Sequence, residues 1–198
     1  MATLVRVSTG HVPRPQQVEL HRAKARFKVL VAHRRFGKTV FCVNELIHRA
    51  RRCAQPAPRY AYLAPTQIQA KDVAWSYLKR YTAAIPGAQV SESELWVELP
   101  PRVTDKEKGE QGARIRLYGA EHADRLRGLY FDGVVLDEYA YMSPRVWAEV
   151  VRPALADRQG WAIFIGTPLG RNGLADLYES AVRGFASEPS RPNPTREC

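Results

Sequence analysis

Four short apolar segments constrain the fold of this chain more than any other feature. They cover residues 27–32 (FKVLVA), 60–64 (YAYLA), 132–136 (DGVVL) and 161–165 (WAIFI). Short, mostly apolar runs of this length are typical of strands buried on both faces of a parallel sheet. Segments with helical periodicity over 39–52, 67–81 and 144–152 lie between them, and a further helical pattern covers 173–182. The alternation predicts an α/β fold with a mainly parallel central sheet flanked by helices.

The remaining segments complete a one-domain prediction. A short helix is expected within 16–24, and alternating patterns over 94–99 and 114–118 indicate half-exposed strands. Pro153 is expected to interrupt the helix that begins at Pro144. We assign residues 1–183 to the folded domain and residues 184–198, which are rich in Pro, Ser and Arg, to a loose tail.

Composition favours a polyanionic partner. The chain has 198 residues and a net charge of +10, much of it from arginine, which suits phosphate contacts. Its three cysteines form no CxxC pair, which argues against a disulfide framework or a zinc site. No apolar run approaches the roughly 18 residues of a membrane span, and no signal-peptide pattern begins the sequence, so we expect a cytoplasmic protein without membrane contact.

The first apolar segment leads directly into a phosphate-loop pattern. Residues 32–39 (AHRRFGKT) match G-x-x-x-x-G-K-[ST] except that Ala32 replaces the first glycine. Gly37 permits a tight turn, Lys38 reaches the β- and γ-phosphates of a nucleotide, and the Thr39 hydroxyl is a ligand for Mg²⁺. The intervening His33, Arg34, Arg35 and Phe36 complete the predicted nucleotide-binding loop. Arg34 and Arg35 are either exposed charges or, in the case of Arg34, a group that stabilises the γ-phosphate in the transition state.

A second acidic motif follows the third apolar segment. Asp137 and Glu138 come directly after VVL, as in a Walker B motif. Asp137 would hold Mg²⁺ opposite Thr39, and Glu138 would position and deprotonate the attacking water. Either motif alone has an ordinary explanation, a GKT at a helix start or acids after a strand. Their joint occurrence predicts a P-loop NTPase of the RecA/ASCE-like class that binds ATP and Mg²⁺.

Three motifs together resemble a known family. RRFGKT (34–39), LDEYA (136–140) and GTPLGRN (166–172) are similar to the ATPase half of tailed-bacteriophage terminase large subunits, the motors that package viral DNA. The resemblance extends over about residues 13–178. In this family the first position of the phosphate loop is relaxed, which accommodates Ala32.

The resemblance implies roles for further residues. PRPQQ (13–17) is similar to the element that contacts adenine, and Gln17 fits its glutamine; a helix-start glutamine without a role is the alternative. Gly166, Thr167 and Pro168 match the coupling motif that senses the γ-phosphate, unless they form only a turn. Arg127 matches an arginine that acts in trans on a neighbouring subunit's nucleotide, although a surface or DNA-facing arginine would look the same.

The resemblance also implies what the chain acts on. It implies a terminase motor that couples ATP hydrolysis to translocation of double-stranded DNA, bound without sequence preference and in a salt-sensitive way. It further implies a homo-oligomeric ring, contacts with the capsid portal and the small terminase subunit, and a place in the host cell cytoplasm. Family members usually continue into a nuclease domain, for which we expect no room before Cys198, so nuclease activity is not expected.

Two other classes remain open at this stage. One is a different RecA-like ATPase that depends on nucleic acid, such as a helicase, although such proteins usually carry a second RecA domain. The other is a nucleotide-binding assembly module with little turnover of its own. A small-molecule kinase fits less well, because it would more often retain the first glycine and has less need of the +10 charge.

Overall fold

The computed structural model describes residues 8–101 and 111–187 and has a seven-stranded sheet at its centre. The strand order is β1-β7-β6-β2-β5-β4-β3. Five strands run parallel: β1 (Phe27–Val31), β7 (Trp161–Gly166), β6 (Gly133–Leu136), β2 (Arg59–Ala64) and β5 (Arg114–Gly119). The antiparallel strands β4 (Trp96–Glu98) and β3 (Gln89–Ser91) close one edge. The predicted α/β class with a mainly parallel sheet is confirmed.

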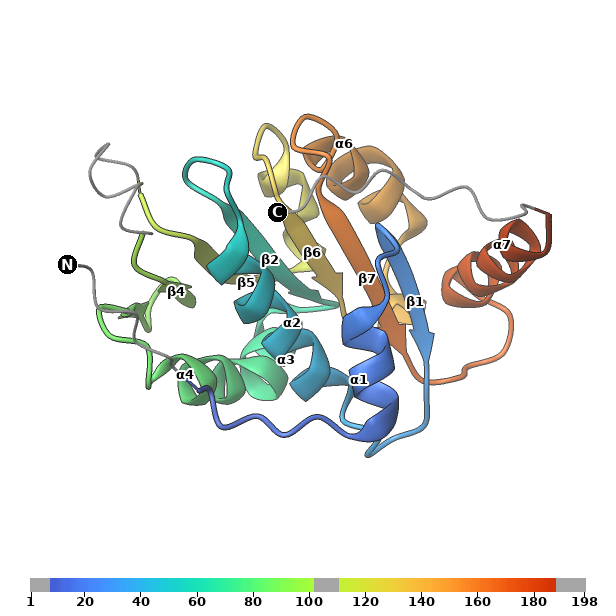
Figure 1. Ribbon diagram of the computed structural model, residues 1–198. Helices are drawn as coiled ribbons and strands as arrows, with labels where there is room; N and C mark the ends of the chain where they lie inside the picture. The colour runs from blue at the N-terminus through green and yellow to red at the C-terminus, as the bar shows by residue number, and fades with distance from the viewer. Residues whose placement is uncertain (1–7, 102–110, 188–198) are drawn as a thin grey trace.

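Helices cover both faces of the sheet (Figure 1). One face carries α1 (Pro15–Arg22), α2 (Lys38–Arg52) and the continuous helix formed by α3 (Gln67–Ala70), η1 (Lys71–Trp75) and α4 (Ser76–Thr82). The other face packs against η2 (Ala120–Leu126), the helix of η4 (Val146–Val151) and α6 (Arg152–Ala154), and α7 (Gly173–Ser187). The short turn η3 (Tyr139–Tyr141) follows β6.

Alternate residues of the central strands supply the two cores. In β7, Trp161, Ile163 and Ile165 join the core under α2, whereas Ala162 and Phe164 join the core under η4 and α7. Because successive side chains of a strand point to opposite faces, a strand buried on both faces needs apolar residues at consecutive positions, as β7 has. Strand β1 departs from this pattern at Lys28, which is buried and pairs with Glu45.

Pro153 does not end its helix, contrary to the sequence prediction. The chain stays helical through Ala154, with a π-helical turn over Val146–Val151 in which the Arg152 N–H donates to the Trp147 carbonyl. The wider π turn changes the hydrogen-bond register immediately before the proline, whose ring would otherwise meet a carbonyl of the preceding turn. The proline is thus absorbed by a local change of helix type.

Three further features of the secondary structure differ from the sequence prediction. Strand β3 was not predicted, and the expected helix over 67–81 contains the π turn η1. Helix α7 extends to Ser187, so residues 184–187 are helical although they were assigned to the tail. The rest of the tail, 188–198, lies outside the described residues. None of the helices in the described ranges is long and apolar enough to cross a membrane.

A buried carboxylate connects α1, β1 and α2. Glu45 is 1% exposed, and its carboxylate contacts His21 Nδ1 at 2.6 Å, Arg49 Nε at 2.8 Å and Lys28 Nζ at 3.4 Å. Burial alone raises the pKa of Glu45, but the His21 hydrogen bond and the charges of Lys28 and Arg49 outweigh it and lower the pKa from 4.5 to about 2. The ionised carboxylate therefore stabilises the packing of α1 against α2.

We predict that Glu45→Gln lowers the free energy of unfolding at pH 7 by about 3 kcal/mol, the equivalent of the pKa difference. Because the folded-state pKa is depressed, the contribution of Glu45 is present above pH 4.5 and declines as the pH falls toward 2. Urea unfolding from pH 7 to pH 3 should show the wild type converging on the variant. Glu179→Gln, which removes an exposed ion-pair partner of Arg183, is the control. A difference between wild type and Glu45→Gln that does not vary with pH would contradict the prediction.

Candidate functional site

The three sequence motifs meet at one edge of the sheet. The phosphate loop follows β1, the Gly166-Thr167-Pro168 turn follows β7, and Asp137-Glu138 follows β6. These strands are consecutive and parallel in the order β1-β7-β6, so their carboxyl ends lie side by side. Ligands of open α/β sheets bind beyond this edge. Strand β7 thus lies between the phosphate-loop strand and the Walker B strand.

The phosphate loop has the backbone that a tight turn needs. Gly37, the N-cap of α2, has φ +88°, and Arg35 also lies in the left-handed region with φ 65°. Ala32 does not have a positive φ, and its N–H donates to the Gly166 carbonyl at 3.3 Å. The first position of the motif therefore needs no glycine here, whereas Gly37 does.

Helix α1 holds this loop from the outside. Gln17, which is 2% exposed, donates from Nε2 to the Gly37 carbonyl at 3.2 Å and accepts at Oε1 from the Arg14 N–H. The Arg14 guanidinium donates to the carbonyls of Arg35 and Phe36 at 2.9 and 3.1 Å. Since the N–H and C=O of a trans peptide unit point in opposite directions, the N–H groups of Gly37 and Lys38 face away from α1. Sequence reasoning selected Gln17 but not Arg14, which lies in the same segment.

Lys38 links the phosphate loop to the turn that follows β7. Its buried Nζ donates to the carbonyls of Ala32 at 2.7 Å and His33 at 3.3 Å and to Thr167 Oγ1 at 3.4 Å. The Thr167 N–H and hydroxyl in turn donate to the Glu138 carboxylate at 3.4 and 3.5 Å. The structure therefore brings Lys38, Thr167 and Glu138 into one hydrogen-bonded chain. Glu138 itself has φ 48°, a strained conformation for a residue other than glycine.

Asp137 has a partner that sequence reasoning did not identify. The Tyr62 hydroxyl, on β2, donates to Asp137 Oδ2. Burial raises the pKa of Asp137, the Tyr62 hydrogen bond lowers it, and the neighbouring Glu138 raises it, with a net upward shift. A tyrosine inside an apolar strand carries no motif signal, so only the pairing of β2 with β6 reveals this contact.

The other predicted residues are more exposed. His33, Arg34 and Arg35 lie at the surface of the phosphate loop, and Pro168 is exposed beyond β7. Arg127 is not brought to the phosphate loop of its own chain. Its half-exposed guanidinium pairs with Asp124 at 2.9 Å and Glu149 at 3.4 Å.

The donor set suits Mg²⁺ held together with a nucleotide. Thr39 and Asp137 offer two hard oxygen ligands, and the Asp137 carboxylate accepts a hydrogen bond from the Tyr62 hydroxyl. Within the described ranges no group of three or more His, Cys, Asp or Glu side chains could hold a metal ion by itself. Mg²⁺ commonly uses one or two protein oxygens and takes its remaining ligands from phosphates and water.

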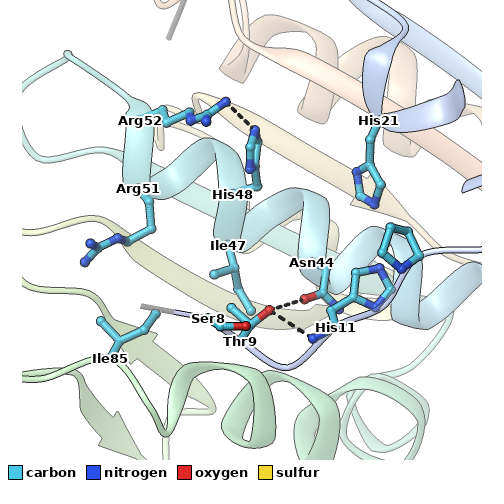
Figure 2. Close-up of a pocket in the computed structure, with 11 residues that line it drawn as sticks. Ser8, Thr9, His11, His21, Asn44, Ile47, His48, Arg51, Arg52 and Ile85 are labelled. Carbon is cyan, nitrogen blue, oxygen red and sulfur yellow. Dashed lines mark hydrogen bonds between the residues drawn. The ribbon is translucent and has the colours of Figure 1, made fainter. Parts of the chain in front are cut away.

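A hollow of about 510 Å³ lies elsewhere, along the outer side of α2 (Figure 2). Its walls include Thr9, His48, Arg51, Arg52 and Ile85, and none of the phosphate-loop or Walker B residues. Arg52 contacts the His48 ring at 2.8 Å, and burial followed by the Arg52 charge lowers the pKa of His48. This hollow is separate from the site built by the motifs.

The sheet topology and the arrangement of the motifs are those of a P-loop ATPase fold of the RecA/ASCE-like class. No family model matches the chain. The chain is 29% identical to the large terminase subunit of Thermus virus P23-45 over 188 residues, which cover 90% of this chain and 38% of that protein. The same figures apply to the large terminase subunit of Thermus phage G20c.

Solved structures agree with the sequence comparison. The large terminase ATPase domain of Thermus phage P74-26 superposes with a TM-score of 0.71 at 28% identity, covering 86% of this chain and 70% of that chain. The large terminase of another thermophilic bacteriophage has the same fold, with a TM-score of 0.68 at 14% identity over 91% of this chain and 44% of that chain. The chain is therefore similar, in sequence and in fold, to the ATPase domain of phage terminase large subunits, as its motifs indicated.

We predict that Gly37→Ala destabilises the fold more than a Gly→Ala substitution at an ordinary left-handed glycine does. A Cβ at Gly37 would lie 2.8 Å from Gln17 Nε2, in addition to the roughly 1–2 kcal/mol cost of a left-handed alanine. Gly128→Ala is the matched control, because Gly128 has φ +82° but nothing within 4 Å of its Cβ position. Urea unfolding of both variants measures the difference, and equal losses of stability would show that the Gln17 contact does not restrict Gly37.

Proposed function

We propose that this chain is the ATP-hydrolysing motor domain of a DNA-packaging terminase, which couples hydrolysis to movement of double-stranded DNA. The observation that carries the proposal is the hydrogen-bonded chain Lys38–Thr167–Glu138, which joins the phosphate loop, the coupling motif and Walker B at one sheet edge. The similarity to terminase ATPase domains supports the same function, although the chain spans only 38% of the length of the curated relatives. The thermophilic-bacteriophage large terminase that superposes at 14% identity has also been solved in complex with ATP-γ-S and with ADP.

Each residue of the site has a role in this proposal. The N–H groups of Gly37 and Lys38 and the Lys38 ammonium bind the phosphates, with Lys38 exchanging its carbonyl partners for phosphate oxygens. Thr39 and Asp137 would hold Mg²⁺, which would supply positive charge to neutralise the phosphates. Glu138 orients the attacking water and accepts its proton, and the Thr167 N–H and hydroxyl hold that carboxylate in place. Thr167 also contacts Lys38, so loss of the γ-phosphate is transmitted to β7.

Residues of the phosphate loop, of α1 and of the turn after β7 complete the proposed nucleotide site. Arg34 stabilises the charge that develops on the γ-phosphate, while His33, Arg35 and Phe36 line the loop. Gln17 binds loop carbonyls through Nε2, so we propose that any contact with adenine is made from this fixed position. Gly166 and Pro168 flank Thr167 and shape its turn.

The net charge of +10 supports DNA as the partner. Binding through phosphate neutralisation would be independent of sequence and would weaken steeply with salt. By the same family similarity we propose a homo-oligomeric ring that works with the capsid portal and the small terminase subunit in the host cell cytoplasm.

We predict that Lys38→Ala abolishes ATP hydrolysis and weakens nucleotide binding, because the point charge on the β- and γ-phosphates is lost. Phosphate release with and without double-stranded DNA, together with titration of a fluorescent ATP analogue, measures both effects. Lys79→Ala is the control, since Lys79 pairs with Glu92 at the surface, away from the site. Unchanged turnover in Lys38→Ala would refute the phosphate-loop assignment.

We further predict that Arg127 acts on a neighbouring subunit. Arg127→Ala should bind ATP normally and hydrolyse it at least roughly 10²-fold more slowly, as expected for a lost transition-state charge. Mixing it with Lys38→Ala should restore part of the activity, because some interfaces then pair an intact phosphate loop with an intact arginine. Arg145→Ala, whose guanidinium pairs with the same Glu149, is the control. Co-assembly without recovery would assign Arg127 a role within its own subunit and favour Arg34 as the catalytic arginine.

A further inference from the structure

Tyr62 is a buried hydroxyl inside the proposed metal site. It lies on β2, is 1% exposed, and belongs to the core between the sheet and α2. Strand β2 pairs with the Walker B strand β6, with Tyr62 opposite Val135, and the Asp137 N–H donates to the Leu63 carbonyl at 2.8 Å. This register fixes the position of the Tyr62 ring relative to Asp137. The sequence motifs assign no role to this residue.

The hydrogen bond at Tyr62 has a definite direction. The Tyr62 hydroxyl donates its proton to Asp137 Oδ2, and the carboxylate oxygen accepts it. The phenol on β2 therefore holds one oxygen of the Asp137 carboxylate.

This contact leaves the other carboxylate oxygen of Asp137 oriented for a metal ion. With Oδ2 of Asp137 occupied by Tyr62, Oδ1 remains for the metal or its water. Partners that hold metal ligands in this way typically contribute roughly 10- to 100-fold in metal affinity.

We propose that Tyr62 is a positioning residue that holds the Walker B Asp137 carboxylate and orients it for the divalent cation of the bound nucleotide. The inference rests on the proposed ATPase function and deepens it. It gives β2, which carries no recognised motif, a direct part in building the metal site. It also predicts that removing one oxygen atom changes metal binding while leaving the phosphate-loop contacts of Lys38 intact.

The test is Tyr62→Phe, with Tyr60→Phe as the matched control. Tyr60 lies two residues earlier on the same strand, is equally buried, and undergoes the same chemical change at the end of the strand away from Asp137. Mn²⁺, which electron paramagnetic resonance detects directly, replaces Mg²⁺ as the probe in the presence of a non-hydrolysable ATP analogue. We expect the apparent Mn²⁺ affinity to fall about 10-fold or more in Tyr62→Phe and to stay unchanged in Tyr60→Phe.

Two further measurements make the result specific. Binding of a fluorescent ATP analogue in excess EDTA should be the same in Tyr62→Phe and wild type, since the metal-independent contacts remain. In an Asp137→Asn background, Tyr62→Phe should cause little further loss of Mn²⁺ affinity, because the residue acts through Asp137. This cycle also separates positioning from general loosening of the core, which would be additive.

The outcomes distinguish the inference from the function on which it rests. A wild-type chain that binds neither the nucleotide nor Mn²⁺ with it overturns both. A wild-type chain that binds both, with equal Mn²⁺ affinity in Tyr62→Phe, overturns only the role of Tyr62. Equal losses in Tyr62→Phe and Tyr60→Phe, or full additivity with Asp137→Asn, would likewise assign Tyr62 to packing alone.

Discussion

The site depends on the insertion of β7 between β1 and β6. Parallel pairing on both sides of β7 places three carboxyl ends next to one another, and each end carries a different chemical group. At Gly166 the end of β7 packs closely against α7, because a Cβ there would lie 2.6 Å from Leu174 Cδ2. Thr167 hydrogen-bonds both Lys38 and Glu138, so the turn after β7 is a structural bridge between the phosphate loop and Walker B.

Support for the phosphate loop comes from outside the motif. Arg14 and Gln17 bind the loop carbonyls from α1, and the Glu45 network fixes α1 against α2 and β1. The loop is thereby held between α1, which precedes it in the chain, and α2, which begins at its end. A fixed loop presents its N–H groups without reorganisation when a phosphate arrives, which lowers the free-energy cost of binding. The replacement of the first glycine by Ala32 does not disturb this arrangement.

The acidic end of the site is similarly built by neighbours. Glu138 is held by Thr167 in a left-handed conformation, and Asp137 is held by Tyr62. The two carboxylates therefore leave β6 toward different partners although they are adjacent in sequence. Such separation suits two carboxylates with different tasks, one toward a metal and one toward water.

The sequence alone determined the four buried strands, the order of the helices and the three motifs. These follow from local patterns: apolar runs of strand length, helical periodicity, and Gly-Lys-Thr at a strand–helix junction. It did not determine β3, the π turns, or the passage of a helix through Pro153, because each depends on how the backbone packs against the sheet. The roles of Arg14 and Tyr62 were also hidden, since their partners lie 21 or more residues away in sequence. Only the strand order and the packing of α1 brought those side chains to the site, and a one-dimensional pattern contains neither.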